Sequence, residues 1–223
     1  MTPMQHMLLG VGAKKKVYLD DVFSNYLWTG DGASTRTITN NLDMSGEGAL
    51  VWIKNRESTQ DHVLADTVRG ATKKIHTNKT NAEFNSSNTV KSFTSTGFTV
   101  GTNNEVNQSN VDYTSWSFRK AKGFFDIITY TGTGTSTNAD GHLDINHSLA
   151  SVPGMVIVKS TSGTSNWWVY HRGLATNNSK AVFLQSPSAA ASHSSYWNGT
   201  APTASQFTVG QWLNTSGSTY VAY

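Results

Sequence analysis

Short runs of β-branched and aromatic residues recur along the chain, separated by stretches rich in Gly, Ser, Asn and Thr. Runs of this kind between turn-forming residues are typical of β-strands. Residues 50–53 and 155–158 are continuously apolar, as expected for central strands that are buried on both faces. Residues 113–118 alternate instead, so that every second side chain, including Trp116, lies on one face. Further strands are expected at residues 22–29, 98–100, 124–131, 167–170, 181–184 and 207–209.

The apolar runs occur twice in the same order, roughly one hundred residues apart. The sequence Phe-Thr-Val-Gly at residues 98–101 recurs unchanged at 207–210, and Val-Trp-Ile-Lys at 51–54 resembles Val-Ile-Val-Lys at 156–159. Self-similarity of this kind indicates tandem repeats. We therefore predict an all-β fold with two tandem β-sandwich repeats of the jelly-roll type. One larger sandwich built from both repeats is the alternative.

The repeat alignment also predicts the domain boundaries. Tyr223 falls where Trp116 falls in the first repeat, so we expect that the native chain continues or that a neighbouring chain completes that edge. The expected parts are an N-terminal segment at 1–19, a first repeat at 20–118, a short linker at 119–122 and a second repeat at 123–223.

Residues found in both repeats are expected to serve the scaffold. Arg69 and Arg172 each precede a glycine, and we expect them to pair with a carboxylate or with loop carbonyls, because a guanidinium has five donors. At Trp167 and Trp168, strand alternation is expected to send one ring inward and the other outward. A Gly-x-Gly sequence follows the first strand of each repeat, and positive φ angles are expected at Gly30, Gly32, Gly132 and Gly134.

Composition and charge exclude several classes of protein. Charged residues make up only 14% of the chain, which leaves little material for exposed helices or a coiled coil. The net charge is +3 with no dense basic stripe, so we expect no nucleic-acid partner. There is no cysteine, which excludes disulfides and thiolate chemistry. No apolar run is long enough to span a bilayer, so membrane insertion is not expected.

The sequence contains no recognisable catalytic or metal-binding motif. The 7 His residues are dispersed and lack the spacing of zinc ligands. Residues 140–144, Asp-Gly-His-Leu-Asp, lack the pattern of a calcium loop and are expected to form a polar hairpin loop. No nucleophile elbow and no phosphate loop occurs. We therefore expect no catalytic residues, no metal and no cofactor, and a protein that is not an enzyme.

Three aromatic residues of the second repeat favour a binding function. Tyr196, Trp197 and Trp212 lie in polar surroundings in the second repeat, and the two tryptophans have no counterpart in the first. Large rings in such surroundings suit stacking on a glycan or on a protein partner. The alternative is that they fill gaps between the repeats or cap the sandwich.

The chain resembles a known type of viral protein. Segments such as YLDDVFSNYLWTGDG, GEGALVWIKNR, FTSTGFTVGT, GFFDIITYTGTG and YWNGTAPTASQFTVG resemble the tandem repeats of virion structural and tail-fibre-like proteins of marine tailed phages, above all those infecting cyanobacteria. The resemblance implies lectin-like β-sandwich modules, assembly in the host cytoplasm into the virion, and other virion proteins as partners. It also implies homo-oligomers and contact with a host surface glycan, and it supplies no catalytic residue.

The segment that precedes the first repeat is the candidate virion anchor. Its apolar part is expected to bury against a neighbouring virion protein, and its basic part to meet an acidic surface. The residues concerned are Met7, Leu8, Leu9, Lys14, Lys15 and Lys16. The alternative is a tail without fixed structure.

Three functions follow in order of preference. The first is a non-enzymatic structural protein of a phage virion, in a tail fibre, a tail appendage or a capsid decoration. The second is a carbohydrate-binding module that uses the aromatic residues of the second repeat. The third is a polysaccharide depolymerase, which requires a cleft with two carboxyl groups about 5–10 Å apart.

Overall fold

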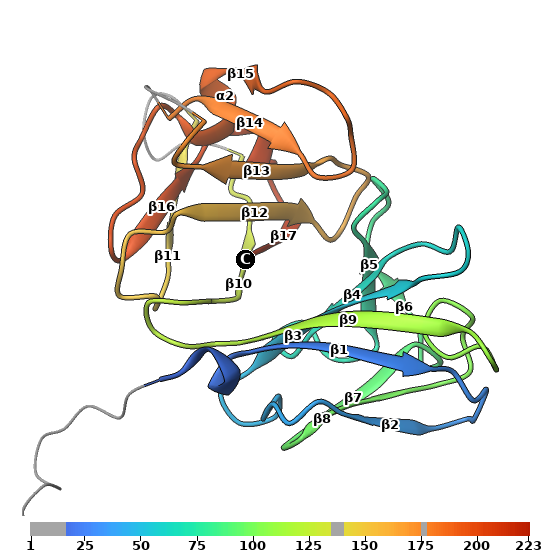
Figure 1. Cartoon of the computed structure of the whole chain (residues 1–223). Helices are drawn as coiled ribbons and strands as arrows, with labels where there is room; N and C mark the ends of the chain where they lie inside the picture. The colour runs from blue at the N-terminus through green and yellow to red at the C-terminus, as the bar shows by residue number, and fades with distance from the viewer. Residues whose placement is uncertain (1–16, 135–140, 175–177) are drawn as a thin grey trace, which may run out of the picture.

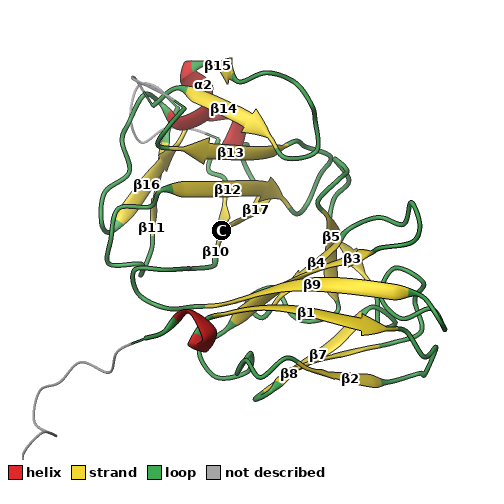
Figure 2. Ribbon diagram, in the orientation of Figure 1, coloured by secondary structure: helices red, strands yellow, loops and turns green. Residues whose placement is uncertain are grey.

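The computed structural model describes residues 17–134, 141–174 and 178–223. Antiparallel strands are the main regular secondary structure of the described chain, which also has one short α-helix and two short 3-10 helices (Figure 2). This confirms the all-β sandwich fold that the hydrophobic pattern predicts. No helix in the described ranges is long and apolar enough to cross a membrane.

The first unit is a sandwich of a six-stranded and a three-stranded sheet (Figure 1). It is preceded by the 3-10 helix η1 (Leu19–Asp21). The large sheet has the order β1-β9-β3-β4-β5-β6, with strands β1 (Phe23–Thr29), β9 (Asp112–Arg119), β3 (Ala49–Asn55), β4 (Val63–Asp66), β5 (Lys73–His76) and β6 (Phe84–Asn85). The small sheet has the order β2-β8-β7, with strands β2 (Arg36–Thr39), β8 (Gly97–Val100) and β7 (Val90–Thr94).

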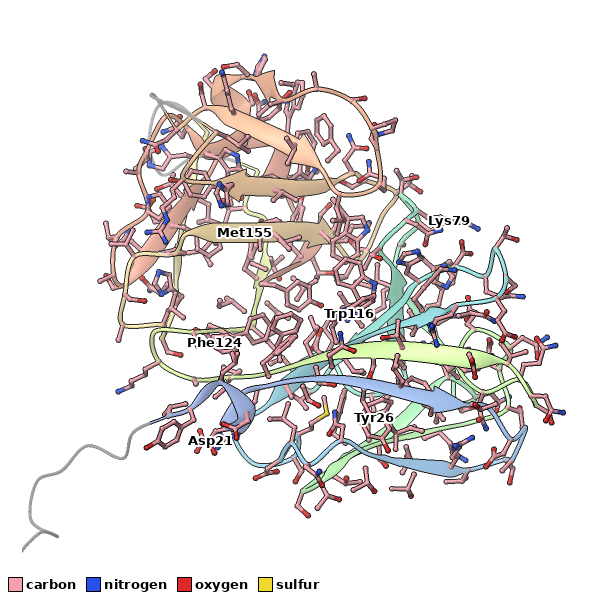
Figure 3. The ribbon with its side chains drawn as sticks, viewed as in Figure 1. Asp21, Tyr26, Lys79, Trp116, Phe124 and Met155 are labelled. Carbon is pink, nitrogen blue, oxygen red and sulfur yellow. The ribbon has the colours of Figure 1, made fainter. Side chains whose placement is uncertain are left out.

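The core of the first unit lies between its two sheets. Trp28, Val51 and Tyr113 from the large sheet pack with Ile38 and Phe98 from the small one, and all are buried. Figure 3 shows Tyr26 on the side of β1 that faces this core and Trp116 on the side of β9 that faces the second unit. Each buried side chain of this size contributes about 1.5–3 kcal/mol.

The second unit has the same plan. Its large sheet has the order β10-β17-β12-β13-β14-β15, with strands β10 (Ile128–Thr131), β17 (Thr219–Ala222), β12 (Met155–Ser160), β13 (Trp167–His171), β14 (Lys180–Phe183) and β15 (Ala191–Ser192). A two-stranded sheet of β11 (Leu143–Asn146) and β16 (Gln206–Val209) faces it. The helix α2 (Ser194–Trp197) and the 3-10 helix η2 (Gln211–Leu213) complete the core on this side.

The two large sheets have identical strand order. In each, the first and third strands of the unit flank its final strand, and the fourth to sixth strands follow outward. The loops agree as well: Gly30 N–H donates to Val111 O at 2.7 Å, and Gly132 N–H donates to Ser218 O at 2.8 Å. Tandem duplication and the boundaries at residues 118 and 123 stay predictions, and the shared strand order supports them.

The prediction of positive φ is wrong for two of the four repeated glycines. Gly32 and Gly134 have φ angles of 70° and 66°, as expected, but Gly30 and Gly132 do not have positive φ. A Cβ added at Gly30 would lie 2.1 Å from Gln108 O, and one at Gly132 would lie 2.2 Å from Thr215 O. Glycine is required there because another backbone passes too closely, which is a tertiary effect.

One further expectation about the second unit is corrected, and the alternation at Trp167 and Trp168 is confirmed with one addition. The strand expected at 124–131 begins only at Ile128, because residues 121–125 form a turn closed by a bridge between Ala121 and Phe125. Neither tryptophan of the pair points to solvent: Trp167 is 0% exposed and Trp168 is 6% exposed. Trp168 enters the core of its own unit, while the first unit covers Trp167.

A third apolar core joins the two units. Leu50, Leu64 and Ile75 of the first unit pack with Trp167 and Val221 of the second, and all are buried. The second unit therefore covers the part of the outer face of the first large sheet that carries Leu50, Leu64 and Ile75. This is why Trp167 is buried although it lies on the face of β13 opposite to its own core.

Hydrogen bonds across the contact fix how the units sit. The Trp167 indole N–H donates to His76 O at 3.0 Å and to Lys79 O at 3.1 Å. The Tyr223 hydroxyl donates to Asp66 Oδ2 at 2.6 Å. Backbone groups also pair, since Glu83 N–H donates to Thr161 O at 3.0 Å. The two sandwiches thus share both apolar surface and backbone bonds.

Arg69 takes the scaffold role predicted for it. Its guanidinium lies 2.6 Å from Asp66 and 2.9 Å from Glu83, with only 4% of its side chain exposed. Arg172 has no carboxylate partner among the described residues, and its backbone N–H donates to Gly154 O at 3.0 Å. The prediction of a carboxylate partner is therefore confirmed for Arg69.

Candidate functional site

The first candidate site is an aromatic cluster around the exposed Trp212, at the end of the second unit. The 3-10 helix η2 places Trp212 at the surface, where it is 48% exposed. One side of its ring stacks on His193, with the ring centroids 4.7 Å apart and an interplanar angle of 20°. His193 caps α2, and its Nδ1 accepts a hydrogen bond from Ser195 N–H at 3.1 Å. The cap holds the imidazole in the orientation that supports Trp212.

Two buried rings fix the position of Trp212 from below. Trp168 lies 5.8 Å from it in an edge contact, and Tyr196 lies 5.4 Å from it at a tilt. Trp168 and Tyr196 also touch each other, with centroids 4.9 Å apart. We call Trp168, His193, Tyr196 and Trp212 the Trp212 platform. Its geometry suits a planar, half-apolar ligand that stacks on a ring, since an exposed aromatic held by neighbours loses little freedom on binding.

The structure separates the three aromatic residues that the sequence singles out. Tyr196 and Trp212 meet in the platform, but Tyr196 is 5% exposed and only supports it. Trp197 is 2% exposed, packs on Tyr170 at 5.8 Å and donates its indole N–H to Lys180 O at 3.1 Å. Trp197 is thus a core residue with no free face. The predicted anchor residues Met7, Leu8, Leu9, Lys14, Lys15 and Lys16 lie outside the described residues.

Sequence reasoning missed two members of the platform. His193 gives no signal of its own, because its contact with Trp212 depends on how α2 and η2 come together. Trp168 was expected to contribute to a strand, and its ring reaches the platform through the core.

A second candidate is an apolar cavity of about 300 Å³ between the units. Its walls come from both sandwiches, and Figure 3 shows Phe124 and Met155 on either side of the gap between them. Asp126 is the only carboxylate among the described residues that line the cavity. A polysaccharide hydrolase needs a pair of carboxyl groups, so this cavity lacks the arrangement expected of a depolymerase.

Asp126 is fully engaged by its neighbours. The Lys120 ammonium lies 2.9 Å from Oδ1, and Ser148 donates its N–H and its hydroxyl to Oδ2 at 2.7 and 2.9 Å. Burial alone would raise the pKa of Asp126, but these donors outweigh burial and hold that pKa below its ordinary value. The carboxylate therefore stays ionised and serves to fasten the turn that joins the units.

A third candidate is a cluster of Asp61, His76 and Glu105, which the dispersed sequence positions did not reveal. His76 Nδ1 lies 3.6 Å from Asp61 Oδ2, and His76 Nε2 lies 2.8 Å from Glu105 Oε1. One ring nitrogen of His76 and one oxygen of each carboxylate lie within 4.8 Å of one another, which is close enough for a shared ion. Lys79 pairs with Asp61 at 2.6 Å, and Lys74 pairs with Glu105, so ammonium groups already balance the charge. We assign the cluster to structure rather than to metal binding.

Comparison with known proteins gives a family but no activity. A family model described as a domain of unknown function, DUF7483, matches residues 20–223 and so spans both units. No curated protein and no solved structure matches the chain. Because the match covers nearly the whole chain, this protein belongs to the DUF7483 family.

Proposed function

We propose that this protein is a non-enzymatic structural component of a phage virion, in a tail fibre, a tail appendage or a capsid decoration. It is assembled in the host cytoplasm and contacts other virion proteins. The single observation that carries the proposal is the shared core between the two sandwiches, in which Leu50, Ile75 and Trp167 are buried. The resemblance of the repeats to marine phage proteins supplies the virion context.

The contact between the units suits a protein that must transmit force without bending. Domains joined only by a linker move relative to each other by default. Here the linker side chain Lys120 is tied to Asp126, and Tyr223 of the second unit reaches the buried Asp66–Arg69 pair of the first. A rigid double sandwich keeps its outer end at a fixed distance and angle from its attachment, as a particle component requires.

Electron cryo-microscopy of the purified virion tests this proposal. The expected result is density that accommodates two joined sandwiches with six-stranded sheets, together with peptides of this chain in the purified particle. A particle that contains no copy of the chain would refute the virion proposal, whatever the protein binds in isolation.

A carbohydrate-binding module is the second candidate, and the exposed face of Trp212 favours it. A sugar ring stacks its C–H face on an aromatic side chain, and the supporting rings keep Trp212 ready for that contact. A host surface glycan would then be the ligand of the virion component.

A glycan array with the wild type and Trp212→Ala tests the second candidate. Loss of stacking is expected to weaken binding about fivefold, since ring contacts contribute on the order of 1 kcal/mol. Tyr18→Ala is the matched control, because Tyr18 is also an exposed aromatic, at 62%, but lies just before the first unit. Binding that survives Trp212→Ala and fails with Tyr18→Ala would place the glycan elsewhere.

A further inference from the structure

The edge strand β1 is the longest open edge among the described sheets. It lies at the end of the first large sheet and pairs with β9 along all 7 of its residues (Figure 1). The opposite edge strand, β6, has 2 residues, as does β15 in the second unit, and β10 has 4. Short edge strands protect a sheet from pairing with other chains, and β1 lacks that protection.

The hydrogen-bond pattern identifies which groups of β1 face outward. Gly30 N–H donates to Val111 O at 2.7 Å, and Arg119 N–H donates to Val22 O at 2.8 Å. Hydrogen-bonded and open positions alternate along an antiparallel strand. The N–H and C=O groups of Phe23, Asn25 and Leu27 therefore lie on the open edge.

No other backbone group among the described residues pairs with these three positions. At the end of the strand, the Thr29 carbonyl accepts a hydrogen bond from the Arg36 guanidinium. The free part of the edge therefore runs from Phe23 to Leu27.

Nothing in the sequence of β1 discourages pairing. The strand reads Phe-Ser-Asn-Tyr-Leu-Trp-Thr, with no charged residue and no proline, and its ladder with β9 has no register shift. Natural proteins usually place Lys, Pro or a bulge on such an edge to prevent association. The outward face even carries Leu27, which is 58% exposed.

We propose that β1 pairs antiparallel with β1 of a second copy of this chain, about a twofold axis through Asn25. In this register Asn25 faces Asn25 of the second copy, and Leu27 lies beside Phe23 of the second copy. The three open donor–acceptor pairs of each strand then meet those of the other. The two large sheets become one continuous sheet across the dimer.

Self-complementarity is the reason to name a second copy as the partner. A twofold interface must match a surface with itself, and this register pairs the exposed Leu27 with the ring of Phe23 in both halves. Phe23 is already held in place by Phe118, with ring centroids 5.0 Å apart. Cross-strand pairs of an aromatic and an aliphatic side chain stabilise antiparallel strands.

Cysteine cross-linking of the full chain tests the register without background, because the protein contains no cysteine. Asn25→Cys is expected to give a covalent dimer with a short bismaleimide, since directly opposed Cβ atoms lie about 4.5–5.5 Å apart. Thr29→Cys is the matched control, because Thr29 lies on the same face of β1 but outside the paired residues, and in this register the two Thr29 positions are about 26 Å apart along the strands. Equal cross-linking of both variants, or of neither, would overturn the register.

Sedimentation velocity over a range of concentrations tests the interface itself. The wild type is expected to sediment as a dimer of the 24.2 kDa chain, and Leu27→Lys is expected to lose the dimer. Val152→Lys should keep it, since Val152 is 55% exposed but lies in the second unit. Asn25→Pro gives an independent check, because its N–H faces outward and proline is tolerated at such a position of an edge strand. A monomeric wild type, or a dimer that survives both β1 variants, would refute the proposal.

Discussion

Lys159 is a fully buried lysine whose ammonium group pairs with carbonyls alone. Its Nζ donates to Ser160 O at 2.7 Å, and the described residues give it no carboxylate partner. Burial disfavours the charged form and lowers the pKa of Lys159 to about 8. Lys54, in the corresponding strand of the first unit, likewise donates to the carbonyls of Ser58 and Gln60. A lysine in each unit thus holds the loop that follows the central strand.

The depressed pKa predicts that stability rises with pH. An unfolded lysine keeps its proton until about pH 10.5, whereas the folded protein releases the Lys159 proton near pH 8. Between these values the unfolded state binds more protons, so the free energy of unfolding increases with pH, by at most about 3 kcal/mol. Urea unfolding at pH 7.5 and 9.5 measures the rise, which Lys159→Met should remove and Lys54→Met should retain. Parallel pH curves for wild type and Lys159→Met would contradict the assignment.

Close backbone approach at Gly30 predicts a large effect from one methyl group. Gly30→Ala would place its Cβ 2.1 Å from Gln108 O, so the loop must move, and we expect a loss of about 2–3 kcal/mol in the free energy of unfolding. Gly163→Ala is the control, because its nearest neighbour would lie 3.9 Å from the Cβ and its φ is not positive. Chemical denaturation should leave Gly163→Ala within about 1 kcal/mol of wild type. Similar midpoints for the two variants would show that the loop yields easily.

At the scale of elements, β5 is held by charges from two distant loops. Glu105 accepts a hydrogen bond from Lys74 and lies 2.8 Å from His76 Nε2, and these two residues share one face of the strand. Asp61 pairs with Lys79 just beyond the end of the strand. Burial alone would raise the pKa of Glu105, but its contacts with His76 and Lys74 outweigh burial and lower that pKa. The stability from this carboxylate is therefore present above its ordinary pKa and is lost as pH falls below it.

Glu105→Gln tests that contribution. Removing the carboxylate leaves Lys74 buried without its counter-charge, so we expect a loss of about 3 kcal/mol in the free energy of unfolding at pH 7. The difference from wild type should shrink as pH falls below about 4, where the wild-type carboxylate is itself protonated. Glu57→Gln provides the control, because Glu57 is exposed. A penalty that is the same at pH 7 and pH 3 would show that the amide disturbs packing rather than charge.

The strands could be predicted from sequence because their residues alternate or form apolar runs, as at Phe98–Val100 in β8 and Met155 onward in β12. The start of β10 could not be predicted, because Phe124 and Phe125 are of a residue type that is common in strands. In the structure they belong to a turn at the contact between the units. The charge cluster was also hidden. Asp61, His76 and Glu105 meet only after β5 has paired and the loop before β9 has closed.

At the scale of the whole molecule, the contact between units decides how the protein unfolds. Trp167 is the largest fully buried side chain, and its indole bonds to two carbonyls of the first unit. Sequence alternation predicts that one ring of the Trp167–Trp168 pair points away from its own core, but nothing in the local pattern shows that a second unit covers that face. In the Trp212 platform, Trp212 and Tyr196 could be singled out from the sequence by residue type. His193 and Trp168 could not, because their contacts with Trp212 depend on tertiary packing.

Trp167→Ala is expected to uncouple the units. The lost packing costs about 3–5 kcal/mol, most of it at the contact between the sandwiches. Differential scanning calorimetry should show one transition for the wild type and two for the variant. Trp212→Ala, which removes a half-exposed ring that is not part of that contact, should keep one transition. A single transition in Trp167→Ala would mean that the remaining contacts suffice.

The position of β9 sets the order in which the protein can form during synthesis. Both neighbours of this strand, β1 and β3, leave the ribosome long before residues 112–119, yet they bond to β9 and not to each other. Phe23 cannot pair until Phe118 has been synthesised. In the second unit, β10 likewise cannot pair until β17 has been synthesised. Closing such long loops is slow. Each half of the nascent chain therefore carries an unpaired first strand, and a third strand that is paired only with the fourth, until its final strand emerges. Translation speed over residues 30–111 governs how long these edges of the first unit stay exposed to other chains.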